Sequence, residues 1–549
     1  MKAFVLNSGP RGRVAIAMRV GVSLAALLAA GAGSAAWAQA ETQTVSPDTT
    51  QAATPGQEVG QPAADAAGDG DIVITGRRAA LEAADERKRR SETIVDSVVA
   101  DDAGKLPDNS ITEVLQRVSG VSIVRFAALG DPDHYSVQGS GVQVRGLTGV
   151  ASRLNGREIF SANNGRAILW SDVTPELMAA VDVYKASTAD LIEGGTGGQI
   201  DLRTKMPFDF NGKFHIAGTG ELALGDMANK ADPSGSVLIT DSFDTPIGRI
   251  GLLGDVAFSQ FSSLSQFIRV SPYFKTKLSD GNERYVPSGF AYGDEAFQYK
   301  RYGIYGAAQW QPAESLTFTG SFFQSRYKSQ SSDYGTQLDS QTLAVDPASS
   351  SFDSNGLLTK TSALFNRDTA TFAPTGGSVN SSGNKGFVES NTRTRDYSLS
   401  FVWAPTDSHV SLKGSLQRVD SRQVYDRLDI FRDVGFGQSF GMDLTGDLPQ
   451  ITVSPATQAS FADPANYFWT ASMPHNERNK GRLDSGQLDA EYTFDNSFFR
   501  SVKVGGRYAK RTERDLSNGY NWTALGRGWN GDPQLTYANA APGDVASHA

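Results

Sequence analysis

The residues best suited to catalysis or metal binding are few and far apart in this chain. Among its 549 residues there is no cysteine, which excludes disulfides, cysteine-based zinc sites and thiol nucleophiles. No two histidines stand at a helical ligand spacing such as H-E-x-x-H. The histidines are His134, His215, His409, His475 and His548. The sequence therefore favours neither a metal centre nor a cysteine enzyme.

A glycine cluster, Gly194-Gly195-Thr196-Gly197-Gly198, is the next candidate for chemistry. Such loops can hold phosphates, but the phosphate-binding pattern needs a following Lys-Ser/Thr and a helix. Neither is present, so the cluster indicates a tight backbone course before a strand. A periplasmic hydrolase stays an alternative, although no G-x-S-x-G context accompanies a Ser, His and Asp order. We expect no catalytic residue, no cofactor and no enzyme activity.

Composition limits the class of fold and the partners. Glycine supplies 57 residues, hydrophobic residues 39% and charged residues 20%, a glycine-rich profile that favours β structure over coiled coil or disorder. Lys+Arg 51 against Asp+Glu 60 give a net charge of -9. The chain thus has no global basic field to hold phosphates, and nucleic acid is disfavoured as a partner.

The N-terminal sequence predicts export followed by a tether. A basic start, the apolar stretch Val20–Ala32 and the small residues of Ala36-Trp37-Ala38 indicate a cleaved signal peptide over residues 1–38. The alternative is a membrane anchor, for which the apolar core is short. Residues 39–70 contain almost no large apolar side chain, which predicts a flexible segment.

An apolar, β-branched run stands at the end of this tether. It is composed of Asp71, Ile72, Val73, Ile74, Thr75 and Gly76. The run predicts a short strand, which could add to the exposed sheet edge of a partner. On the pattern alone, it could equally be the first strand of the next domain.

Residues 77–210 predict a compact α+β domain with short helices and short strands. A capping box at Ser110–Glu113 predicts a helix that ends at Gly120. Thr174-Pro175-Glu176 predicts the start of a second helix that runs through Leu177 and Met178. The predicted buried face of the first helix is Ile111, Val114, Leu115 and Val118. The predicted strands are Val121–Arg125, Val142–Arg145, Ala179–Tyr184 and Gln199–Arg203.

From 211 to 549 apolar side chains recur at alternate positions, in runs of about nine or ten residues. In one run Ile250, Leu252, Val256 and Phe258 alternate with smaller or polar residues. Runs of this length and repeat are expected of tilted strands that cross an outer membrane. Soluble sandwiches alternate as well, so the connections must distinguish the two.

The connections alternate between short and long. Thr245–Arg249 and Asp495–Phe499 are tight links, whereas Ser262–Lys300, Tyr327–Arg395 and Asp420–Ser485 are long and polar. Bacterial barrels have this asymmetry, while repeated structureless loops of that size are uncommon in compact soluble domains. The aromatic residues near run ends, as an interfacial girdle needs, are Phe258, Tyr302, Trp310, Trp403, Phe494 and Tyr508.

The order of these segments resembles that of TonB-dependent outer-membrane receptors. Val142–Leu147 resembles the IRG strand of the family's plug, and Leu154–Arg157 the hairpin that follows. Val181–Lys185 resembles the later V-E-V-x-K strand, and Gly194–Thr204 the closing glycine-rich segment. A subfamily common in Caulobacter-like and sphingomonad-like bacteria has similar forms of Asn155–Glu158, Glu193–Gly198 and Lys205–Phe208. Its members are often linked to uptake of carbohydrates or other organic nutrients.

The resemblance implies a transporter with an α+β plug followed by an antiparallel transmembrane β-barrel. Its implied partners are outer-membrane lipid, a nutrient ligand and the TonB-ExbB-ExbD complex. This complex would pull on residues 71–76, which correspond to the family's TonB box and are called the box below. Arg145 is the candidate for a charge pair between plug and barrel wall; the alternative is a surface arginine. The residues that match plug motifs are Arg145, Gly146, Asn155, Gly156, Lys185, Gly194, Gly195, Gly197, Gly198 and Arg203.

The number of strands departs from the family pattern. Roughly ten or eleven strand candidates lie between Phe214 and Arg511, about half of the 22 in a plugged transporter. We therefore expect an incomplete barrel, from a fragment or a prematurely ended copy of a longer receptor. A ferric siderophore receptor of the same fold and a secreted or surface-attached β-rich binding protein remain alternatives. The possible ligand contacts are the aromatic residues Trp469, Tyr520, Trp522 and Trp529.

Overall fold

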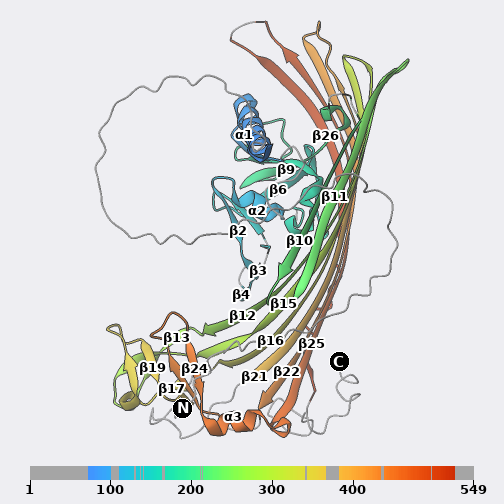
Figure 1. Cartoon of the computed structure of the whole chain (residues 1–549). Helices are drawn as coiled ribbons and strands as arrows, with labels where there is room; N and C mark the ends of the chain where they lie inside the picture. The colour runs from blue at the N-terminus through green and yellow to red at the C-terminus, as the bar shows by residue number, and fades with distance from the viewer. Residues whose placement is uncertain are drawn as a thin grey trace, which may run out of the picture. The chain divides into compact units, whose positions relative to one another are not determined.

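The computed structural model describes most of the chain after residue 71. The described ranges are 72–100, 110–128, 131–135, 138–139, 141–163, 167–210, 212, 214–339, 343–366, 382–434, 438–495 and 498–525. The predicted signal peptide, the predicted tether and Asp71 lie outside them. The described residues belong to one compact unit, residues 70–549. This unit contains a small mixed domain, the plug, and one large antiparallel sheet (Figure 1).

The plug is built around a five-stranded sheet in the order β1-β8-β9-β6-β7. Only the pairing of β6 with β9 is parallel. Two smaller pairs, β2 with β5 and β3 with β4, complete its strands. The bounds are β1 Val95–Val99, β2 Val121–Val124, β3 Phe126–Ala128, β4 Asp131–Tyr135, β5 Gly141–Val144, β6 Val150–Leu154, β7 Arg157–Glu158, β8 Met178–Tyr184 and β9 Gly198–Thr204. The predicted α+β plug is confirmed.

Helix α2 (Ile111–Gln116) forms where the sequence places its signals. The Ser110 hydroxyl accepts a hydrogen bond from the Glu113 N–H at 3.2 Å, the N-cap half of the predicted capping box. The predicted apolar face is buried in the plug core. Gly120 has a φ of 72° and closes the turn after the helix, where a left-handed conformation favours glycine.

The second predicted helix is wrong beyond its first turn. Pro175–Leu177 form a single 3-10 turn, η2, and Met178 already begins β8. Strand β8 pairs with β1 on one side and β9 on the other, and Val181 and Val183 are fully buried. Proline starts the turn, but burial of β-branched side chains between two strands makes the next residues extended.

The strand predicted at residues 71–76 is also corrected, because helix α1 spans Ile72–Arg90. The stretch Ala79–Ala84 consists of strong helix formers. A helix satisfies its backbone hydrogen bonds internally, whereas a strand needs a neighbouring edge. Among the described strands none pairs with residues 72–76. The strand is therefore absent in the chain alone, and its pairing with a partner stays a prediction.

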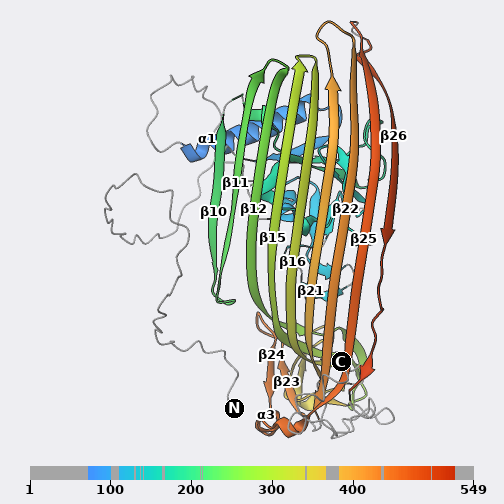
Figure 2. The same cartoon turned by 90° about the vertical axis from the view of Figure 1, so that its right-hand side faces the viewer.

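The large sheet holds nine long strands that lie side by side in sequence order (Figure 2), each antiparallel to the next. They are β10 His215–Gly225, β11 Lys230–Thr245, β12 Gly248–Val270, β15 Gly289–Ala313, β16 Leu316–Asp339, β21 Ser382–Trp403, β22 Val410–Val434, β25 Tyr467–Thr493 and β26 Ser501–Arg514. Short β27 (Thr523–Ala524) pairs with β25. Within the described residues β10 and β26 remain unpaired edges. The predicted incomplete antiparallel barrel sheet is confirmed.

The strands are much longer than the predicted nine or ten residues. β12 has 23 residues and β25 has 27. The predicted long loops Ser262–Lys300, Tyr327–Arg395 and Asp420–Ser485 are therefore strand over much of their length. Polar residues occupy both faces of these extensions, so the alternating hydrophobic signal fades while the backbone ladder continues. The tight link at Thr245–Arg249 is confirmed, since β11 ends at Thr245 and β12 begins at Gly248.

The three long connections fold into a small cap instead of forming structureless loops. They form a four-stranded sheet, β18-β19-β23-β24, the pairs β13-β14 and β17-β20, and helix α3 (Pro455–Phe461). The strand bounds are β13 Tyr273–Lys277, β14 Glu283–Pro287, β17 Leu343–Ala344, β18 Ser350–Phe352, β19 Leu358–Thr361, β20 Phe365–Asn366, β23 Phe440–Asp443 and β24 Gln450–Val453. A separate apolar core that includes Phe290, Leu338 and Phe440 lies among them.

The two faces of the large sheet differ in what they bury. Along β12, Leu253 and Ala257 are buried in the same core as the plug, whereas Leu252 and Val256 are each 52% exposed. The other large apolar side chains exposed on the outward face include Ile304, Trp310, Phe318, Tyr397, Leu399, Leu416, Leu488, Val502 and Tyr508. These exposed apolar side chains do not pack against one another in a dry core. Their position on one face of the sheet suits contact with hydrocarbon.

Candidate functional site: the plug and its seat on the large sheet

The hairpin between β6 and β7 is held by the strand beside it. Asn155 and Gly156 have φ values of 50° and 79°, the positive pair that two-residue hairpins with Asn-Gly adopt. The Asn155 amide donates to the Thr204 hydroxyl at 2.8 Å and accepts from the Thr204 N–H at 3.0 Å. The Gly156 N–H donates to the Asp201 carboxylate at 2.9 Å. The predicted hairpin motif therefore positions its turn against β9.

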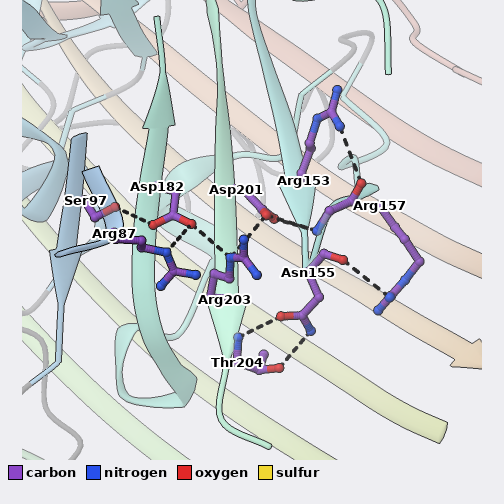
Figure 3. A network of polar contacts seen from close by, with 10 residues as sticks. Arg87, Ser97, Arg153, Asn155, Arg157, Asp182, Asp201, Arg203 and Thr204 are labelled. Atoms are coloured by element: carbon purple, nitrogen blue, oxygen red, sulfur yellow. Dashed lines mark hydrogen bonds and ion pairs between the residues drawn. The ribbon is translucent and has the colours of Figure 1, made fainter. Parts of the chain in front are cut away.

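A charged network crosses the plug sheet from helix α1 to this hairpin (Figure 3). The Asp182 side chain, fully buried, pairs with the guanidinium groups of Arg87 at 3.2 Å and Arg203 at 2.9 Å. Arg203 also lies 3.5 Å from the carboxylate of Asp201. Burial raises the pKa of Asp201 above its usual range. The network links α1, β8, β9 and the hairpin through side chains as well as backbone.

At Gly197 and Gly198 the glycine cluster runs too close to neighbouring backbone for a larger residue. A Cβ atom on Gly197 would lie 2.9 Å from the Leu147 carbonyl oxygen, and one on Gly198 would lie 2.8 Å from the Tyr184 carbonyl oxygen. Gly198 also has a φ of 147°. The tight backbone course predicted for Gly194–Gly198 is thus present, with β9 beginning at Gly198.

Arg301, on β15, connects the sheet to the plug from inside. Its side chain is completely buried. The guanidinium group donates to the Ser171 carbonyl at 2.8 and 3.0 Å and to the Gln138 side chain at 3.3 Å. It also lies over the rings of Tyr299 and Tyr327, at 4.7 and 5.5 Å. A buried cation is tolerated because hydrogen bonds and ring faces replace its water.

Asp172 is a buried acid of the plug that interacts electrostatically with this cation. Burial raises the pKa of Asp172 to about 7, against the opposing effects of the Ser161 hydroxyl and the Arg301 charge. The Ser161 hydroxyl donates to one carboxylate oxygen at 3.0 Å, while the other has no hydrogen-bond partner among the described residues. The backbone carbonyl of Asp172 accepts a hydrogen bond from Ser325 of β16. This carboxyl therefore titrates near neutral pH.

Further polar contacts seat the plug on the sheet. The buried Lys205 ammonium lies 3.3 Å from the Asp255 carboxylate on β12, and Arg507 on β26 pairs with Glu158 at 2.9 Å. Gln417 donates to the Glu158 carbonyl oxygen at 2.9 Å. Strands β12, β15, β16, β22 and β26 all contribute such contacts. The seat is thus a broad polar surface with separate anchor points.

At three glycines of the sheet, Gly251, Gly303 and Gly481, plug side chains pack where a Cβ atom would otherwise lie. We call these three residues the glycine seats. A Cβ atom on Gly303 would lie 2.7 Å from a Leu177 methyl carbon, and one on Gly481 would lie 2.4 Å from the Phe160 ring. Gly251 meets Pro207 and Phe208 in the same way. The sheet is therefore shaped to the plug at the level of single carbon atoms.

The predicted charge pair of Arg145 is not formed among the described residues. Arg145 is exposed, has a φ of 54°, and its N–H donates to the Gly120 carbonyl at 2.8 Å. Lys185, another motif residue, pairs with Asp96 inside the plug. The pairs that join plug and sheet use Lys205, Arg507 and Lys503 instead. Arg301 could have been suspected from the sequence, because it is a charge beside an alternating apolar run.

Two of the predicted ligand contacts each stack on a ring of the large sheet. Tyr520 stacks on the His475 ring with centroids 4.2 Å apart, and Trp522 stacks on Phe431 at 4.9 Å. Both come from the segment after β26, which returns along β25. They remain 56% and 51% exposed. Trp469 is half-buried on β25, and Trp529 lies outside the described residues.

Two further features of the described residues concern metal binding and membrane-spanning helices. No group of three or more His, Asp and Glu residues there is placed to hold a metal ion. No helix within the described ranges has the length and apolar character needed to cross a membrane.

Comparison with known proteins gives one family match. Residues 87–199 match the TonB-dependent Receptor Plug Domain. No curated protein matches the chain.

Three solved structures are similar at low identity. The unliganded ferric citrate transporter FecA is 12% identical, over 80% of this chain and 80% of that one, with a TM-score of 0.27. A mutant of the ferric enterobactin receptor PfeA from Pseudomonas aeruginosa is 9% identical over 78% and 72%, with a TM-score of 0.33. The siderophore receptor PiuA from Acinetobacter baumannii is 12% identical over 79% and 64%, with a TM-score of 0.28.

These TM-scores are too low to add weight, so the family rests on the plug match. The match coincides with the domain that seats on the sheet through Arg301, Lys205 and the glycine seats. The subfamily suggested by the sequence stays a prediction. The chain therefore contains, over residues 87–199, a domain that matches the plug of TonB-dependent receptors.

Proposed function

We propose that this receptor takes up a large nutrient across the outer membrane of a Gram-negative cell, driven by the TonB-ExbB-ExbD complex. The observation that carries the proposal is a folded plug seated on the face of an antiparallel sheet whose opposite face is apolar and exposed. A wide barrel must be plugged to prevent leakage. Strands with an outward apolar face suit a bilayer.

Energy would reach the plug mechanically. Residues 71–76 are continuous with helix α1, whose Arg87 pairs with the buried Asp182 in the centre of the plug sheet. Lys88 near the helix end pairs with Asp96 of β1 at 2.6 Å. Tension on the box would therefore be transmitted to the plug sheet through both the chain and these ion pairs.

Pairing with TonB as an added strand would require the start of α1 to unwind. The β-branched Ile72, Val73, Ile74 and Thr75 and the following Gly76 all have low helix propensity. Their helical conformation is accordingly cheap to lose. An added strand would supply backbone hydrogen bonds in return for those of the helix.

For the ligand we propose a carbohydrate or another organic solute. The exposed rings of Tyr520 and Trp522 offer flat apolar faces beside polar strands, which suits stacking on a sugar ring. A ferric siderophore is the alternative, and iron-dependent uptake by the same cells would favour it.

The test compares two proline variants in cells that express the receptor gene and carry TonB. Ile74→Pro removes a strand hydrogen bond within the box and breaks the added strand. Ala64→Pro, in the preceding segment, is the matched control. We expect accumulation of a labelled oligosaccharide to fall about tenfold or more in Ile74→Pro, as for lost pairing of a few kcal/mol, with ligand binding at the surface unchanged.

Equal accumulation in Ile74→Pro and Ala64→Pro would contradict the role of the box. Uptake that persists after the proton gradient is collapsed would contradict energisation by TonB. A ferric chelate taken up in place of every oligosaccharide would overturn the carbohydrate assignment and leave the receptor assignment intact.

A further inference from the structure

A row of five cations crosses the large sheet from β16 to β26. The pairing registers place Arg326 opposite Arg393, Arg393 opposite Arg422, Arg422 opposite Lys480, and Lys480 opposite Arg514. Each residue is therefore the direct cross-strand neighbour of the next. We call these five residues the cation row. Like charges directly opposite one another destabilise a sheet, so such a row needs a compensating partner.

The cation row lies on the outward face. Side chains alternate between faces along a strand, and the adjacent Thr392, Ser421 and Gly481 are buried on the plug side. Ser421 accepts a hydrogen bond from the plug's Ala162 N–H at 2.9 Å, which fixes the inner face at this level. The five cations therefore point away from the plug, on the face that carries the exposed apolar residues.

Among the described residues, no carboxylate pairs with the cation row. The Arg326 side chain donates to the Asn391 side chain at 3.1 Å, but the side chains of Arg393, Arg422, Lys480 and Arg514 form no ion pair or hydrogen bond within the described part of the chain. The nearest outward carboxylates already have partners. Asp420 pairs with Arg482 at 3.1 Å and Asp484 with Arg418 at 2.6 Å.

The row lies on the same face as the apolar band, nearer the cap. Six residues along each strand toward the tight turns lie Gly320, Leu399, Leu416, Gly486 and Tyr508, which pair in a row of their own. Leu399, Leu416 and Tyr508 are 65%, 63% and 74% exposed. The outward positions between the two rows include the ion pairs of Arg482 with Asp420 and of Arg418 with Asp484. Along the strand direction, the surface thus changes from apolar through mixed charge to cationic.

A groove of about 550 Å³ follows the cationic border. Six cations line it, Arg393, Arg395, Arg422, Lys480, Arg482 and Arg514, together with two acids, Asp420 and Glu513. Several guanidinium groups facing one space favour a ligand with more than one negative charge, because they can form charge-assisted hydrogen bonds to phosphate oxygens.

We propose that the cation row binds the headgroup of an anionic lipid of the outer leaflet, whose acyl chains lie on the apolar band. The continuity of the two surfaces argues for a lipid over a free anion, since only a lipid contacts both. A headgroup with two phosphates spans adjacent cations of the row and relieves their repulsion. The inference rests on the outer-membrane setting proposed above.

The test measures binding of diphosphoryl lipid A to the purified full chain in a neutral detergent, by native mass spectrometry. The variant Arg393→Gln, Arg422→Gln, Lys480→Gln removes the centre of the row. The matched control Arg418→Gln, Lys275→Gln, Lys360→Gln removes the same charge from cations that have carboxylate partners and do not line the groove. We expect the row variant to bind about tenfold more weakly, as for the loss of two or three modest charge-assisted contacts, and the control to bind as the native chain does.

A second variant, Arg393→Lys, Arg422→Lys, retains the charge and should retain most of the binding; it decides the question if the glutamine variant fails to fold. An equal loss in the control would overturn the proposal in favour of general charge attraction. Binding of inorganic pyrophosphate that displaces the lipid completely would assign the groove to a soluble anion. Because the row is remote from the box, unchanged TonB-dependent uptake alongside absent lipid binding would refute this inference alone.

Discussion

The plug buries its apolar side chains inside the domain, whereas the large sheet exposes many of its apolar side chains on the outward face. In the plug, Leu177 and Val181 are fully buried, and the charged groups inside are paired, as Asp182 is with Arg203. In the sheet, Leu399 and Leu416 are 65% and 63% exposed, while the fully buried Arg301 faces inward. The same residue types therefore mark the interior in one region and the exterior in the other.

This difference follows from the solvent of each region. Apolar groups leave water in both cases, but the plug has only its own core and the inner face of the sheet to hide them. In the proposed outer-membrane setting, the sheet has hydrocarbon outside and polar plug atoms inside, so its pattern is inverted. Truncating a leucine in the plug core and truncating one on the outward face of the sheet should therefore lower the free energy of unfolding by unequal amounts.

The largest expected effect is that of Leu177→Ala. Leu177 fills the space above Gly303 and is fully buried, so its truncation leaves a cavity and should lower the free energy of unfolding by about 2–5 kcal/mol. Leu416→Ala, on the outward face, should cost less than about 1 kcal/mol, because lipid fills the space of the lost methyl groups. Urea titration of the two variants in detergent, followed by tryptophan fluorescence, measures the difference. Equal losses would mean that Leu416 is packed inside a protein core.

The next effect depends on pH and concerns Asp172. Since its pKa is raised to about 7, the folded chain binds more protons here than the unfolded chain between about pH 4 and pH 7. The free energy of unfolding therefore falls as pH rises through this window, by up to about 4 kcal/mol, and is level above it. Asp172→Asn should remove that slope. Native and variant chains with the same slope from pH 4 to pH 8 would refute the assignment.

The parts of this fold that the sequence predicted have local signals. Ser110 caps helix α2 by accepting from the Glu113 N–H, and Asn155-Gly156 forms the predicted hairpin turn. The outward apolar residues of β12 follow a period of two because one face of the strand packs on the plug and the other is exposed. Each of these features depends on residues that are close in sequence.

The parts that the sequence did not predict depend on distant partners. Strand β25 continues far beyond its apolar run because β22 pairs with it residue by residue, and a backbone ladder leaves no hydrophobic pattern to detect. Met178 enters a strand instead of a helix because β1 and β9 flank β8. The seat of the plug on Arg301 and Gly303 joins residues more than a hundred positions apart. Such contacts exist only after the fold has formed.

A third prediction concerns a charge on the outward face. Leu416→Arg places a cation within the apolar band, and it should destabilise the chain in a bilayer by about 2–4 kcal/mol if the site is near the midplane. In water-soluble conditions an exposed arginine would cost almost nothing. Unfolding in vesicles and the yield of membrane-inserted chain measure the effect. A fully stable variant would place this face in water and would remove the support for a membrane setting.

The smallest effect expected is that of a single methyl group at the glycine seats. Gly303→Ala puts a Cβ atom 2.7 Å from Leu177 and 2.9 Å from the Thr174 Cβ, and such overpacking costs about 1–3 kcal/mol. Gly254→Ala, on the outward face of β12, meets no atom within 4 Å and serves as the matched control. Because the strain falls between plug and sheet, hydrogen exchange in the plug around Thr174 should accelerate in Gly303→Ala, while exchange in the strands stays as in the native chain. Acceleration of equal size in Gly254→Ala would show that glycine flexibility in the sheet, and not the fit of the plug, sets this stability.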